Sequence, residues 1–86
     1  MWYVVSTSIN QGKPYPFIHT QVDLRTNSRR DAYEAFMRII AEAELLGYRS
    51  YEIWDSDYNV CTCTMRHEAY REESLFNVKM YKDGIY

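Results

Sequence analysis

The sequence SRRDAYEAFMRIIAEAELLG, Ser28–Gly47, carries the clearest secondary-structure signal in the chain. Its apolar residues recur every three or four positions, which places them on one face of a helix of about five turns. This stripe contains Ala32, Ala35, Phe36, Ile39, Ile40, Ala43 and Leu46. Pairs of opposite charge at i,i+4 spacing occupy the other face, at Arg30, Glu34, Arg38 and Glu42. The pattern predicts one long amphipathic helix with a single buried face.

Residues that favour the beginning and the end of a helix flank this segment. Ser28 is a favoured N-cap residue, and Asp31 follows three positions later as a variant of the capping box. Gly47 suits the left-handed backbone conformation that ends many helices. We therefore expect the helix to begin after Ser28 and to end before Gly47.

Two strands are expected before the helix. Residues Trp2–Ile9 are rich in β-branched and aromatic side chains, and Phe17–Arg25 alternates between apolar and polar residues. Residues 10–16, with two prolines and a glycine, form the turn between them. The alternation predicts that the second strand is half-buried and antiparallel to the first, with one apolar face. That face contains Ile18, Thr20, Val22 and Leu24, and the polar face contains His19, Gln21, Asp23 and Arg25.

Strands are also expected after the helix, at Arg49–Asp55 and Val60–His67, with a fifth at Phe76–Tyr81. Residues 68–75 fit either a short helical turn or a loop. The order ββαββ, with the added strand, shows neither a linker nor a repeat. It predicts a single α+β domain over residues 1–86, in which an antiparallel sheet of four to five strands packs one face against the helix. The other face is left to water or to a partner.

The amino-acid composition favours some classes of function and disfavours others. The chain has 86 residues, a formal charge of −2, nine tyrosines and two tryptophans. A small core cannot bury so many aromatic rings, and surface tyrosines are typical of protein interfaces. The weak negative charge argues against a general nucleic-acid binder. The N-terminus lacks the pattern of a signal peptide or membrane span, so we expect a reducing, cytoplasmic location and no membrane contact.

The segment NVCTCTMRHE, residues 59–68, resembles a chemical centre because it holds Cys61, Cys63 and His67. In a strand, His67 lies roughly 13 Å along the chain from Cys63. That separation is too large for one zinc ion, which holds sulfur at about 2.3 Å. A disulfide between strand residues two apart would be strained. We therefore expect free cysteines that join Met65 in the core, and no metal or other cofactor.

The sequence contains no complete catalytic or calcium-binding motif. Asp55, Asp57 and Asn59 match the first half of a calcium loop, but Val60 stands where the loop needs glycine. Only two histidines are available as bases, and His19 is too far along its strand from Asp23 for a direct pair. No phosphate loop or nucleophile motif occurs. The chain is therefore not expected to be an enzyme.

An aromatic and acidic segment follows the helix. Its side chains could dock a basic protein, with aromatic anchors and an acidic rim, or could form a solvated face with Tyr51 in the core. The predicted partner-binding residues are Tyr48, Glu52, Trp54, Asp55, Asp57 and Tyr58. We expect a stoichiometric inhibitor or adaptor that occludes its partner, a profile similar to that of small anti-defence proteins of phages.

The alternative is a nucleic-acid contact at the start of the helix. Arg25, Arg29 and Arg30 crowd this end, although cations there oppose the helix dipole. A placement with an electrostatic cost can indicate a role in binding anions. A distant third alternative is a metal protein that uses the cysteines and histidines. An exposed strand edge also allows a homodimer through sheet extension.

Overall fold

In the computed structural model, residues 1–10, 17–56, 60–69 and 74–83 are described, residues 51–56 by their backbone alone. Five strands and one helix follow the predicted order. They are β1 (Trp2–Asn10), β2 (Phe17–Thr26), α1 (Arg29–Leu45), β3 (Tyr48–Ser56), β4 (Val60–His67) and β5 (Ser74–Lys82). The α+β class and the single long helix are confirmed. The fifth strand begins two residues earlier than the alternation indicated.

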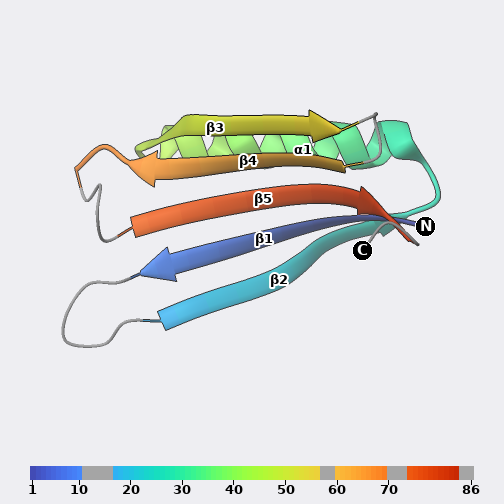
Figure 1. Cartoon of the computed structure of the whole chain (residues 1–86), viewed down its shortest axis with the longest axis horizontal. Coiled ribbons are helices and arrows are strands. Elements are labelled where there is room, and N and C mark those ends of the chain that lie inside the picture. Colours follow the sequence, from blue (N-terminus) through green and yellow to red (C-terminus); the bar gives the residue numbers. More distant parts are fainter. Residues whose placement is uncertain (11–16, 57–59, 70–73, 84–86) are drawn as a thin grey trace.

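The strands form one antiparallel sheet in the order β2-β1-β5-β4-β3. The last strand of the chain therefore lies at the centre of the sheet, between β1 and β4, and β2 and β3 are the edges (Figure 1). The helix connects these two edges and crosses one face of the sheet, where Figure 1 shows it behind β3 and β4. Along the described ranges, no helix covers the opposite face, as expected.

The core lies between the helix and the central strands. The buried residues of α1 are Ala32, Ala35, Phe36, Ile40 and Ala43. From the sheet come Trp2, Val4, Cys61, Cys63, Met65, Val78 and Met80. The prediction that both cysteines and Met65 belong to the core is confirmed. Leu46, which the stripe assigned to the buried face, is 72% exposed because it caps the helix beyond the last packed turn.

The expected end signals of α1 are confirmed. The backbone N–H of Asp31 donates to Ser28 Oγ at 3.2 Å, which satisfies one of the free donors of the first turn. Gly47 has a φ angle of 99°, a conformation that residues with a Cβ atom rarely adopt. The chain then turns directly into β3.

The second strand contains a β-bulge that its regular alternation did not predict. Leu24 pairs with Val4, whereas the next pair joins Val22 to Val5, so Asp23 is an extra residue in β2. Neighbouring strand residues point to opposite faces of a sheet. An extra residue therefore moves every residue beyond it to the face opposite the one that regular alternation predicts. Leu24 packs against the core, but Ile18 and Val22 are 71% and 56% exposed. The prediction of one buried face containing Ile18, Thr20, Val22 and Leu24 is wrong for the first three.

Candidate functional site

The predicted aromatic and acidic surface is only partly described. Tyr48 opens β3 on the helix side, where its ring meets His67 edge-on at 5.1 Å and Phe76 at 5.8 Å. Glu52, Trp54 and Asp55 are described through the backbone of β3, which pairs with β4. Asp57 and Tyr58 lie outside the described residues, as do most of the positions of the calcium-like turn. The docking surface as a whole therefore stays a prediction.

The three arginines near the helix start do not form one patch. Arg25 lies 6.0 Å from the centre of the Tyr3 ring, and Arg29 lies 5.7 Å from that of Trp2. Trp2 and Tyr3 are neighbours in β1 and point to opposite faces of the sheet. Arg30 instead forms an i,i+4 ion pair with Glu34 at 3.2 Å. The cation–π contact of Arg29 gives this residue a structural role at the helix start.

The cysteine-histidine segment has a structural role. Both cysteines are free and buried. His67 Nε2 lies 3.1 Å from the Leu46 carbonyl oxygen, and the Ala69 N–H donates to His67 Nδ1 at 3.0 Å. A carbonyl can only accept and a backbone N–H can only donate, so the ring carries its proton on Nε2. Within the described ranges, no group of three or more His, Cys, Asp or Glu residues could hold a metal ion.

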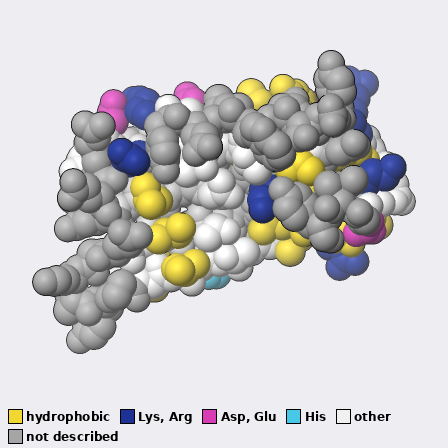
Figure 2. Space-filling model, in the orientation of Figure 1, with side chains coloured by type: hydrophobic (Ala, Val, Ile, Leu, Met, Phe, Trp, Pro, Cys, Tyr) yellow, Lys and Arg dark blue, Asp and Glu magenta, His cyan; other side chains and the backbone are white. Residues whose placement is uncertain are grey.

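The face of the sheet that carries no helix, here called the open face, exposes aliphatic side chains. Strand alternation places Val5 and Ile9 of β1 beside Val22 and Ile18 of β2, and Leu75 of β5 beside Ile9. Figure 2 shows this face, with hydrophobic side chains in yellow among uncharged polar ones. Threonines occupy its centre, including Thr7 and Thr20, whose hydroxyls are 3.2 Å apart.

The charged residues described at open-face positions of β1, β2, β4 and β5 are basic. Arg25, Arg66 and Lys79 occupy positions that point away from the helix. At the corresponding positions of β1, β2, β4 and β5, the described residues include no aspartate or glutamate. Tyr3 and Tyr81 stack on this face with ring centres 5.4 Å apart. The open face therefore combines aliphatic, aromatic and cationic groups.

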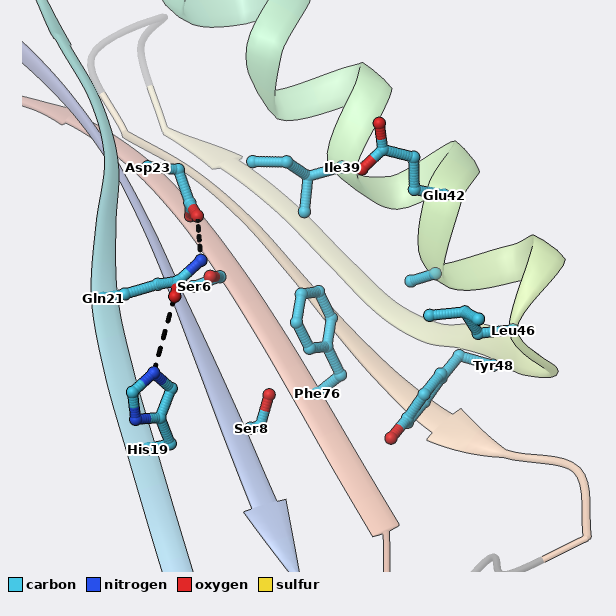
Figure 3. A pocket seen from close by; sticks show the side chains of 11 residues that line it. Ser6, Ser8, His19, Gln21, Asp23, Ile39, Glu42, Leu46, Tyr48 and Phe76 are labelled. Carbon is cyan, nitrogen blue, oxygen red and sulfur yellow. Dashed lines mark hydrogen bonds between the residues drawn. The ribbon is translucent and has the colours of Figure 1, made fainter.

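The helix side contains a groove of about 280 Å³ between α1 and β2 (Figure 3). Its floor forms where β1 changes from Trp2 and Val4 to Ser6 and Ser8 along the same face. Small serine side chains leave space under the helix that larger apolar residues would fill. The groove thus follows directly from the sequence of β1.

The β2 wall of the groove carries a chain of hydrogen bonds, drawn in Figure 3. His19 Nε2 lies 3.4 Å from Gln21 Oε1, and Gln21 Nε2 donates to Asp23 Oδ1 at 2.6 Å. His19 and Asp23, too distant for a direct pair, are therefore connected through Gln21. The other carboxylate oxygen, Asp23 Oδ2, is buried and has no hydrogen-bond partner among the described residues.

The opposite wall comes from the last turns of α1, and Tyr48 and Phe76 close one end. Glu42 brings a second carboxylate, which forms an i,i+4 ion pair with Arg38 at 4.0 Å on the exposed side of the helix. The remaining helix residues of this wall are apolar: Ile39, Ala43 and Leu46. The alternation of β2 predicted a polar face for His19, Gln21 and Asp23, and it did not predict the groove. The helix-facing serines of β1 were the available signal.

Comparisons with known proteins found no matching protein family, no matching curated protein and no matching solved structure. Along the described part of the chain, α1 is too short and too polar to cross a membrane.

Proposed function

We propose that this protein is a small, non-enzymatic module that binds another protein through the open face of its sheet. The observation that supports the proposal best is the bulge at Asp23, which turns Ile18 and Val22 outward on an edge strand. Bulges are frequent at sheet edges and re-aim side chains. An edge strand with exposed aliphatic residues favours aggregation unless something covers it. A partner that covers this face would remove that cost.

The side chains of the open face indicate which chemical groups a partner would present to it. Burying an aliphatic side chain contributes roughly 25 cal/mol per Å² of apolar area removed from water. Arg25, Arg66 and Lys79 would lie near that area and would favour acidic groups on the partner. The aromatic and acidic residues predicted around Trp54 could add a second contact region. The proposed partner surface is therefore apolar with an acidic rim.

The proposed mode of action is occlusion at a ratio of one to one. A stoichiometric inhibitor or adaptor needs only a rigid surface, and an inhibitor of the kind that phages use against host defences fits a chain of this size. The free, buried cysteines support a cytoplasmic location, where thiols stay reduced. Both edges of the sheet, β2 and β3, leave a homodimer as the competing form of assembly.

The test compares capture by the wild-type chain with capture by two variants. Ile18→Lys places a charge on the open face, whereas Leu45→Lys changes an 87% exposed leucine of the helix. A specific partner should bind the wild type and Leu45→Lys but not Ile18→Lys. The purified partner should then form a complex with one copy of each chain, as measured by light scattering. Equal capture by all three proteins would contradict the proposed surface.

A second candidate function is the binding of single-stranded nucleic acid on the same face. The stacked rings of Tyr3 and Tyr81 beside Arg25 and Lys79 favour it, because aromatic platforms and cations bind single strands without sequence preference. Binding of a labelled oligonucleotide should then weaken steeply with added salt. Tyr81→Ala should weaken it further. The absence of binding at low salt would remove this candidate.

A further inference from the structure

The groove between α1 and β2 has walls of different chemistry and faces away from the proposed partner surface. We propose that it binds a small organic ammonium ion with an apolar body. The site lies on the helix side of the sheet, so it does not depend on protein binding at the open face. Each proposal can fail without the other.

The charge of the ligand follows from the two carboxylates that line the groove. Figure 3 shows Asp23 on the β2 side and Glu42 on the helix side. Gln21 occupies one oxygen of Asp23, but Oδ2 is buried without a donor from the described residues. A buried carboxylate oxygen without a donor costs free energy. Because Oδ2 has almost no accessible surface, the Asp23 carboxylate must turn toward the groove before a bound cation with N–H groups can supply the missing donor. Among the described residues of the lining, His19 is the only basic side chain.

The rest of the lining suits an apolar body attached to the ammonium group. The helix contributes Ile39 and Leu46, and the sheet contributes the ring of Phe76. The serine hydroxyls of the floor can accept further hydrogen bonds from the ammonium group. The volume of about 280 Å³ lies just below the usual range of about 300–1,000 Å³ for ligand pockets. An arylalkylamine is therefore a suitable size, and a bare metal ion would leave most of the groove empty.

Three probes of the same shape separate the charge of the ligand from its apolar body. They are 2-phenylethylamine, 2-phenylethanol and 3-phenylpropionate, which carry an ammonium group, a hydroxyl group and a carboxylate. Each is titrated into the ¹⁵N-labelled full chain and followed by two-dimensional NMR. The amine should shift the signals of Gln21, Asp23 and Ala43 saturably and leave Thr7 and Thr20 unchanged. The alcohol should bind at least tenfold more weakly, and the carboxylate should not bind.

Two variants test whether the carboxylates are responsible. Asp23→Asn should weaken amine binding at least tenfold, whereas Glu34→Gln, on an exposed part of the helix, should leave it unchanged. If Asp23→Asn does not fold, Glu42→Gln replaces it, because the Glu42 side chain is 66% exposed and outside the core. Weaker amine binding in the carboxamide variant alone supports the site. Equal affinity for amine and alcohol, or unchanged affinity in the carboxamide variant, would overturn the proposal.

Discussion

The imidazole of His67 lies against Gly47, so that a Cβ atom placed on Gly47 would come within 2.8 Å of His67 Nε2. The same nitrogen bonds the carbonyl oxygen of Leu46, the last residue of the helix cap. The C-terminal end of α1 therefore packs directly against the end of β4. This contact explains why a histidine that resembles a metal ligand in the sequence has a structural role.

Gly47→Ala should destabilise the fold for two reasons. A residue with a Cβ atom at a φ angle of 99° costs about 1–3 kcal/mol, and the close approach to His67 adds to that cost. Chemical denaturation measures the loss in the free energy of unfolding. The same substitution in a His67→Ala background separates the two terms, because only the backbone term remains there. A loss below about 0.5 kcal/mol in the single variant would contradict the strained geometry.

Deletion of Asp23 should be tolerated better than deletion of Gln21. Asp23 is the extra residue of the bulge, so its removal leaves the facing of every other β2 residue unchanged. Removal of Gln21 instead turns Ile18 toward the helix side and His19 toward the open face. Thermal unfolding compares the two deletions, and the Asp23 deletion should show the higher midpoint. The reverse order would show that the bulge does not set the facing of β2.

The bulge in β2 is a feature of the fold that could not be predicted from the sequence alone. The helix, its caps and the strand order of the chain follow from local periodicity and from residues such as Ser28 and Gly47. The alternation of β2 is regular in the sequence, yet the strand pairs with β1 across an added residue. Nothing local in Val22–Leu24 indicates that change, because a bulge is set by pairing between strands. Ser6 and Ser8 were a local signal for the floor of the groove, but its β2 wall depends on the same pairing and was missed for the same reason.

Native Cys61 and Cys63 should resist modification by a thiol reagent. Their exposed fractions are 3% and 0%, so a reagent must wait for the chain to open. Labelling should therefore follow the rate of unfolding and become fast in denaturant. Elemental analysis of the purified protein provides a second measurement and should find no stoichiometric zinc. Rapid labelling of the native protein would contradict the buried positions of both thiols.

Tyr3 should ionise at a higher pH than an ordinary tyrosine. A hydrogen bond from its hydroxyl group to the Asp83 carboxylate is the main cause that raises the Tyr3 pKa above the usual 10.0. The interaction favours the neutral phenol, so it stabilises the fold below pH 10.0 and is lost as the pH rises through the higher folded-state pKa. NMR titration of the Tyr3 ring carbon measures the shift. Asp83→Asn should lower that pKa, and an unchanged value would exclude Asp83 as the cause.

Trp54→Ala and Tyr58→Ala test the aromatic and acidic surface predicted from the sequence. We expect both variants to keep the fold and to lose partner capture, because a few aromatic anchors carry most of the binding energy at protein interfaces, often 2 kcal/mol or more each. Tyr33→Ala is the control, since Tyr33 is an exposed aromatic residue of the helix. Circular dichroism checks the fold, and capture of the partner measures binding. If Ile18→Lys abolishes capture while both aromatic variants retain it, the partner uses the open face alone and the predicted aromatic surface is wrong.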